Sequence, residues 1–217
     1  MDKKDITEAI KKLKETSKKR NFKQSYDIII NLKNLDLKKP EQQVDTFAQL
    51  HFSRGKPIRL AAFAGPELMD EAKAVCKTVI PVDQFDNYAK DKKLTKKLAE
   101  EHDWFIAQAT AMPKVAAAFG RVLGPRGKMP NPKVGCVVPP KANLRPLQEK
   151  LHKTVKLQAK VAPLIQCAVG MEDQNEDEII DNILTIYNTI THVLPQESQN
   201  IASVYLKLTM GKPVRLG

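Results

Sequence analysis

The amino-acid sequence predicts an α/β fold with two domains, one assembled from both ends of the chain and one inserted between them. Strands and helices are expected to alternate through the middle of the chain, which is typical of a mostly parallel sheet. The N-terminal segment, with one helix and three strands, and the C-terminal segment are each too small for a core of their own. We therefore expect the two ends to pack together, with the insertion beginning after Gly65.

The N-terminal segment is expected to open with a surface helix. Ile6, Ile10 and Leu13 recur at helical spacing between charged residues, which gives this helix a narrow apolar stripe and a basic outer face. Apolar and alternating runs then predict strands at 26–32, 44–52 and 58–64. Gly65 and Pro66 end the last of them.

The rest of the chain continues with alternating elements. In the middle, helices are expected at 67–77, 94–101, 113–122 and 145–152, and strands at 79–82, 104–109 and 134–138. The tail is expected to hold strands at 155–158, 164–169 and 202–209 and an amphipathic helix at 176–194. This pattern makes the middle an α/β unit in its own right.

Composition excludes several classes of protein. A chain of 217 residues that is 42% hydrophobic can fill a globular core. No apolar run approaches membrane-spanning length, and Lys and Arg crowd the first twenty residues, so we expect neither a signal peptide nor a transmembrane helix. The three cysteines are far apart and contain no C-x-x-C pair, which argues against a disulfide framework and a thiolate zinc site. We expect a cytoplasmic protein.

The distribution of charge points to a polyanionic partner. The formal net charge is +11, and residues 110–160 carry eleven Lys or Arg against one acid. Residues 1–40 carry twelve against six, whereas residues 161–200 hold seven acids and no Lys or Arg. A solvated surface mixes signs, whereas a surface that binds a polyanion collects one sign. The alternative is that Lys serves only solubility.

Residues 120–135 form the most distinctive segment, a loop with closely spaced glycines and prolines. Such a backbone has a fixed shape and lets a phosphate come near, so we expect a secondary polyanion-facing loop formed by Arg121, Arg126, Lys128 and Lys133. The alternative is a merely structural crossover. It is no P-loop, because six residues separate Gly120 from Gly127 and Met129 stands where the magnesium-binding hydroxyl should be.

No catalytic or metal-binding pattern is present in the sequence. The four histidines lack metal-ligand spacing, and the motifs G-x-G-x-x-G, G-x-S-x-G and H-E-x-x-H are absent. The acids between Glu172 and Asp181 open a predicted helix, where the macrodipole favours them, so no metal site and no cofactor are expected. The alternative function, a nucleotide-dependent enzyme using the middle α/β domain, rests on layering alone, which does not establish function.

Two polar segments near the chain ends are candidates for contact with folded RNA. Alternation places Ser203, Tyr205, Lys207 and Thr209 on one face of the last strand, before a turn at Met210 and Gly211. A polar strand face with a glycine that permits close approach suits the shallow minor groove and 2′-hydroxyls of RNA. An exposed Phe22, beside Asn21 and Ser25, could contact a ribose or base. The alternatives are an ordinary edge strand and a core phenylalanine.

The stretch from Leu123 to Lys133, Leu-Gly-Pro-Arg-Gly-Lys-Met-Pro-Asn-Pro-Lys, closely resembles the signature of the ribosomal protein L-one family, the exit-side stalk proteins of the large subunit. Residues 203–205 and 209–211, with the Phe22 segment, resemble the RNA-contacting ends of that family. The short N-terminus and the turn at 38–42 are similar to its archaeal or eukaryotic branch. The resemblance covers essentially the whole chain.

The resemblance implies a non-enzymatic, monomeric RNA-binding protein on cytoplasmic ribosomes, with a discontinuous domain at 1–65 plus 157–217 and an inserted Rossmann-like domain at 66–156. It implies binding to large-subunit rRNA within the large ribosomal subunit, release of exit-site tRNA, and repression of its own mRNA. The RNA-binding residues that it implies are Asn21, Phe22, Ser25, Ser203, Tyr205, Thr209, Met210 and Gly211. Asn21 and Ser25 depart from the Lys and Thr of bacterial relatives, which affects the expected strength of contact there.

Overall fold

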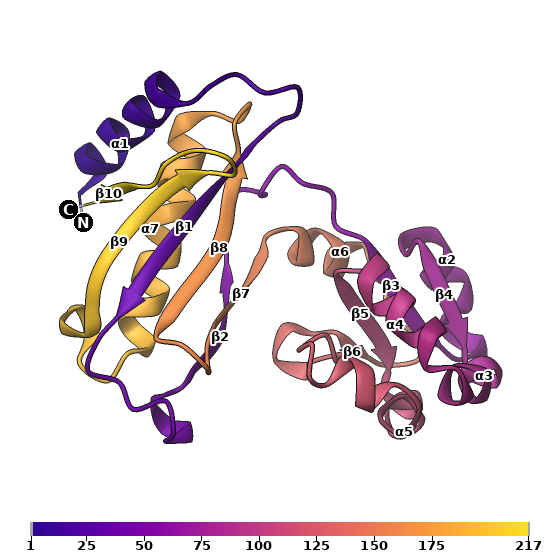
Figure 1. Cartoon of the computed structure of the whole chain (residues 1–217). Helices are drawn as coiled ribbons and strands as arrows, with labels where there is room; N and C mark the ends of the chain where they lie inside the picture. Colours follow the sequence, from indigo (N-terminus) through magenta and orange to yellow (C-terminus); the bar gives the residue numbers. More distant parts are fainter. Residues whose placement is uncertain (1, 217) are drawn as a thin grey trace. The chain divides into compact units, whose positions relative to one another are not determined.

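The chain divides into two compact units in a computed structural model that describes residues 2–216 (Figure 1). Unit one is Met1–Lys56 with Lys153–Gly217, and unit two is Pro57–His152. From the sequence, the inserted domain was expected at residues 66–156. The boundaries differ because the strand at Leu60–Ala64 pairs with strands of unit two, whereas Thr154–Ala159 pairs with a strand of unit one.

Unit one contains a four-stranded antiparallel sheet in the order β10-β9-β1-β8. Its strands are β1 (Ser25–Leu32), β8 (Leu164–Met171), β9 (Ile201–Leu208) and β10 (Val214–Leu216). Side chains of β1, and of β9 from Ser203 onward, alternate between buried and half-buried, as expected when one face of a sheet covers a core. The short edge strand β10, which follows Pro213, was not predicted from the sequence.

Two helices bury their apolar stripes against one face of this sheet. Helix α1 (Lys3–Thr16) contributes Ile6, Ile10 and Leu13, the stripe that the sequence predicted, and α7 (Glu176–Val193) contributes mostly isoleucines. A two-stranded antiparallel sheet, β2 (Val44–Gln49) with β7 (Thr154–Ala159), joins the same core. The remaining elements of the unit are the 3-10 turns η1 (Pro40–Gln42) and η6 (Glu197–Asn200). The other face of the four-stranded sheet keeps partly exposed side chains.

Unit two contains a four-stranded parallel sheet in the order β4-β3-β5-β6. Strand β3 (Leu60–Ala64) is buried at every position, which is typical of a strand covered on both faces. The aromatic rings of Phe63, Phe85, Phe105 and Phe119 pack together in its core. The order of the strands and the intervening helices confirm the predicted α/β layering.

The other strands of unit two are β4 (Thr78–Pro81), β5 (Trp104–Gln108) and β6 (Val137–Val138). Its helices are α2 (Met69–Val75), α3 (Phe85–Lys90), α4 (Lys92–Glu101), α5 (Met112–Leu123) and α6 (Arg145–His152), with 3-10 turns η2 (Pro66–Leu68), η3 (Val82–Gln84), η4 (Ala109–Ala111) and η5 (Pro132–Val134). Strand β6 is shorter than the predicted 134–138, because η5 extends to Val134 and is followed by Gly135, whose positive φ of 91° breaks the extended backbone.

Candidate functional site

The pairing of β1 with β9 brings two of the predicted site residues together across 184 positions of sequence. Ser25 begins β1, and Thr209 directly follows β9. The Ser25 backbone N–H donates to Thr209 Oγ1 at 3.0 Å, and the Thr209 N–H donates to the Ser25 carbonyl at 3.1 Å. Their two hydroxyl oxygens are also 3.0 Å apart. The sheet itself therefore fixes both hydroxyls at one end of unit one.

Two large apolar side chains are exposed next to this pair. Phe22, in the segment that precedes β1, is 52% exposed, and Met210, in the turn that follows β9, is 61% exposed. This exposure excludes the alternative that Phe22 is a core residue. Asn21 is exposed as well. Exposed apolar side chains beside fixed hydroxyls offer contact surface to a partner that carries both apolar and hydrogen-bonding groups.

Gly211 lets the turn lie close to the end of α1. A Cβ atom added at this position would be 3.2 Å from both the Leu208 Cβ and the Ser17 Oγ, closer than ordinary van der Waals contact. The Gly211 N–H donates to the Leu208 carbonyl at 2.9 Å and closes the turn. A larger residue would need Leu208 or Ser17 to move by a few tenths of an ångström, so the glycine permits the turn to lie close to Ser17.

Sequence reasoning missed Gln24, which connects the two segments. Its side chain is only 2% exposed, and its Oε1 accepts a hydrogen bond of 3.1 Å from the Met210 N–H. Its own backbone N–H donates to Glu172 Oε2 at 3.2 Å, and its carbonyl accepts from the Glu172 N–H at 2.9 Å. A single glutamine before a strand gives no sequence signal for this role, because the partner residues are remote in sequence.

Ser203 and Tyr205 lie on the partly exposed face of the four-stranded sheet. In the register of β1 and β9, Ser203 is opposite Asn31, Tyr205 is opposite Ile29, and Lys207 is opposite Asp27. The Asn31 Nδ2 donates to Ser203 Oγ at 2.9 Å. The predicted alternation is therefore confirmed for Ser203, Tyr205 and Lys207, and polar groups extend along this face from the Ser25–Thr209 pair.

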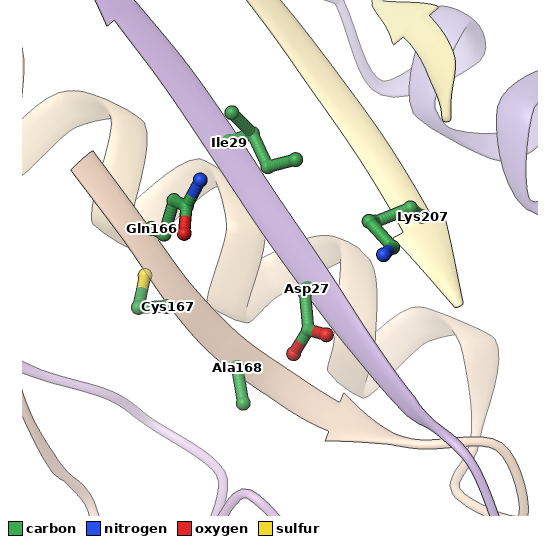
Figure 2. A pocket seen from close by; sticks show the side chains of 6 residues that line it. All are labelled: Asp27, Ile29, Gln166, Cys167, Ala168 and Lys207. Carbon is green, nitrogen blue, oxygen red and sulfur yellow. The ribbon is translucent and has the colours of Figure 1, made fainter. Parts of the chain in front are cut away.

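A shallow hollow of about 340 Å³ lies on the same face. Figure 2 shows its lining residues on three adjacent strands, β8, β1 and β9: Asp27, Ile29, Gln166, Cys167, Ala168 and Lys207. Burial raises the pKa of the Asp27 carboxyl, while a hydrogen bond from the Ser25 hydroxyl and the charge of Lys207 act in the opposite direction. The Ser25 Oγ to Asp27 Oδ1 distance of 3.2 Å links the hollow to the Ser25–Thr209 pair.

The acidic run at the start of α7 is paired with the chain's own cations. Asp173 accepts from Lys23, whose hydrogen bond and charge lower the pKa of the aspartate. Glu176 and Asp177 form ion pairs with Lys14 and Lys3 of α1 at 2.6 and 3.2 Å. No group of His, Cys, Asp or Glu within residues 2–216 is arranged to hold a metal ion. These ion pairs therefore link α1 to the first turn of α7, and the Phe22 segment to the residues that precede α7.

The glycine-rich loop of unit two is fixed to the end of α4 by two of the four predicted cations. The Lys128 Nζ donates to the Ala99 and His102 carbonyls, each at 2.7 Å, and burial lowers its pKa. The Arg126 guanidinium donates to Glu100 Oε1 at 2.9 Å. Arg121 and Lys133 are exposed, but Arg121 lies in the last turn of α5 and not in the loop, where the sequence predicted it. The predicted set thus has a structural part, formed by Arg126 and Lys128, and two cations that face solvent.

The fold and site together define a class: a basic, two-unit α/β protein whose two chain ends form one polar site. The model of the Ribosomal protein L1p/L10e family matches residues 10–212. The chain is 43% identical over 216 residues to the large ribosomal subunit protein uL1 of Methanothermococcus thermolithotrophicus. The similarity covers 100% of this chain and 99% of that protein. The uL1 protein of Methanothermobacter thermautotrophicus is 41% identical over 98% of both chains.

The chain therefore belongs to the Ribosomal protein L1p/L10e family. The uL1 protein of Methanocaldococcus jannaschii is also similar, at 38% identity over 100% of this chain and 96% of that protein. These relatives are archaeal, so both the family and the branch inferred from the sequence are confirmed. Membership in a family of ribosomal proteins also agrees with the expectation of a non-enzyme. Within residues 2–216, no helix is long and apolar enough to cross a membrane.

Proposed function

We propose that the protein is a structural component of the large ribosomal subunit, in the cytoplasm, and binds the stalk region of large-subunit rRNA through unit one. The observation that carries this proposal is the union of both chain ends in one site, where the Ser25 and Thr209 hydroxyls lie 3.0 Å apart near exposed Phe22 and Met210. The family membership and the net charge of +11 support an RNA partner.

The site offers the groups that recognition of folded RNA requires. Hydroxyls and amides can bond 2′-hydroxyls and phosphate oxygens, whereas Phe22 and Met210 can pack on a ribose or an unstacked base. The exposed cations Lys18, Lys19 and Arg20 follow α1 directly and supply attraction for phosphates. Asn21 and Gly211 complete the site, the first as a polar contact and the second by permitting close approach.

The family resemblance suggests two finer roles. We infer that the same site binds a similar structure in the protein's own mRNA and represses its translation, since one surface can serve two RNAs of like shape.

We also propose that unit two assists release of deacylated tRNA from the exit site, with Arg121 and Lys133 as its phosphate contacts because both are exposed. The free protein is proposed to be a monomer, with unit one, residues 1–56 plus 153–217, as the RNA-binding part.

A salt-titrated binding assay tests the main proposal. The protein is titrated with a stalk fragment of large-subunit RNA, with an unrelated duplex of equal length, and with the leader of its own mRNA. All three RNAs are expected to lose affinity as salt rises, with log K falling against log salt by roughly 0.7 to 0.9 per phosphate contact. Retention of the stalk fragment at a salt concentration that releases the duplex supports the proposal. If the stalk fragment and the duplex lose affinity in parallel, the protein is only a generic basic binder of nucleic acid.

A further inference from the structure

We propose that Gln24 is a positioning residue that holds the turn of Thr209, Met210 and Gly211 in the conformation that RNA binds. The proposal rests on the RNA-binding function proposed above and assigns a role in it to a buried side chain. Gln24 is 2% exposed, whereas Asn21 and Phe22 before it and Met210 across from it are exposed. It therefore acts on the exposed groups through the backbone.

The backbone amides of the turn show why this side chain matters. The Thr209 N–H donates to the Ser25 carbonyl, and the Gly211 N–H donates to the Leu208 carbonyl. The Met210 N–H instead donates to the Gln24 Oε1, at 3.1 Å. Two of the three amides thus bind the backbone, which every sequence supplies, whereas the middle one depends on a single side chain. Without that acceptor, Met210 loses the bond that fixes its backbone while its side chain stays exposed.

The acceptor is itself held in place. The Gln24 backbone exchanges two hydrogen bonds with Glu172, one with the carboxylate at 3.2 Å and one with the backbone N–H at 2.9 Å. The neighbouring Lys23 forms an ion pair with Asp173. Both acids belong to the segment between β8 and α7. Gln24 therefore links that segment to the turn through hydrogen bonds, which lowers the cost of ordering the turn when RNA binds.

The test replaces Gln24 by methionine, which has a similar length but no acceptor oxygen, beside Gln158→Met, the same change at an exposed glutamine of β7. Gln24→Met is expected to lower affinity for the stalk fragment about tenfold, the size of one lost hydrogen bond. Affinity for the unrelated duplex and the salt slope are expected to stay unchanged, because no cation is removed. Amide exchange at Met210 is expected to accelerate. Gln158→Met should change none of these.

A purely structural role gives a different result. The affinities for the stalk fragment and for the unrelated duplex then fall together, in proportion to the fraction of unfolded protein at the assay temperature. Thermal unfolding measures that fraction. Folded Gln24→Met protein with unchanged selectivity overturns the proposal, as does an unprotected Met210 amide in the unaltered protein. Should Gln24→Met not fold, Gln24→Asn, which withdraws the acceptor by one methylene, is expected to show the same selective loss. Absence of selectivity in the unaltered protein would instead reject the RNA-binding function.

Discussion

At the scale of single residues, the Thr209 hydroxyl has three partners in Ser25: the backbone N–H, the backbone carbonyl and the hydroxyl. Thr209→Val keeps the shape and removes the oxygen that accepts the Ser25 N–H at 3.0 Å. We expect affinity for the stalk fragment to fall about tenfold, and the free energy of unfolding to fall by about 1 kcal/mol, because one amide loses its acceptor. Thr46→Val in β2 is the matched control. Binding assays and urea unfolding measure both quantities, and equal RNA affinity in the two variants would contradict the expectation.

Asp27 gives the site a pH dependence with a definite sign. Burial raises its pKa above 3.8 in the folded protein, so the folded state binds the proton more tightly than the unfolded chain does. The stabilisation that the protonated Asp27 gives to the folded state is complete below pH 3.8, and it is lost as the pH rises through the raised pKa. Asp27→Asn should therefore be more stable than the unaltered protein at pH 7, with a gap that narrows toward pH 4. Melting temperatures of the two proteins between pH 7 and pH 4 measure this difference in stability. A difference that widens as the pH falls would refute the prediction.

At the scale of elements, Lys128 is one of two cations that join the glycine-rich loop to the end of α4. Lys128 caps the carbonyls of Ala99 and His102 at 2.7 Å each. Lys128→Met leaves both acceptors without this donor, so we expect the free energy of unfolding to fall by about 1–3 kcal/mol. Lys133→Met, at an exposed position of the same loop, should change it by no more than about 0.5 kcal/mol. Denaturant unfolding compares the two, and similar losses would argue against a capping role.

The elements also show what the sequence could predict. Helix α6 has the predicted bounds, and α7 ends one residue from its predicted end, because caps and apolar spacing are local signals. The assignment of Leu60–Ala64 to the N-terminal group of strands was wrong, since its partners β4 and β5 lie later in the chain. Short helices such as α3 carry too few turns for periodicity to detect.

The candidate site was predicted in part for the same reason. Alternation along β9 correctly placed Ser203 and Tyr205 on one strand face. Long-range contacts were beyond reach: nothing in the sequence indicates that Gln24 accepts from Met210, or that Lys128 serves helix α4 rather than a ligand. The family resemblance supplied the candidates at both chain ends, and the structure supplied the contacts between them.

At the scale of the whole molecule, the chain leaves unit one and returns to it through neighbouring strands. Strands β2 and β7 are antiparallel, with Gln49 opposite Thr154, and the Leu50 N–H donates to the Lys153 carbonyl at 2.7 Å. The chain thus enters unit two from β2 and returns from it into β7, and these two strands form one antiparallel pair. A short hairpin turn between β2 and β7 is therefore able to replace the inserted unit. Unit one also has its own continuous core, to which both chain ends contribute.

This connection predicts that unit one folds and binds RNA alone. Residues 1–56 joined to 153–217 by a short Gly-Ser linker should unfold cooperatively and keep the selectivity of the full chain for the stalk fragment, because every proposed contact of the RNA site lies within it. Residues 57–152 alone should bind both RNAs weakly and without preference. Calorimetry and the salt-titrated assay measure these outcomes. Selectivity found only in the full chain would show that unit two takes part in recognising the stalk, and would move the search for further contacts to Arg121 and Lys133.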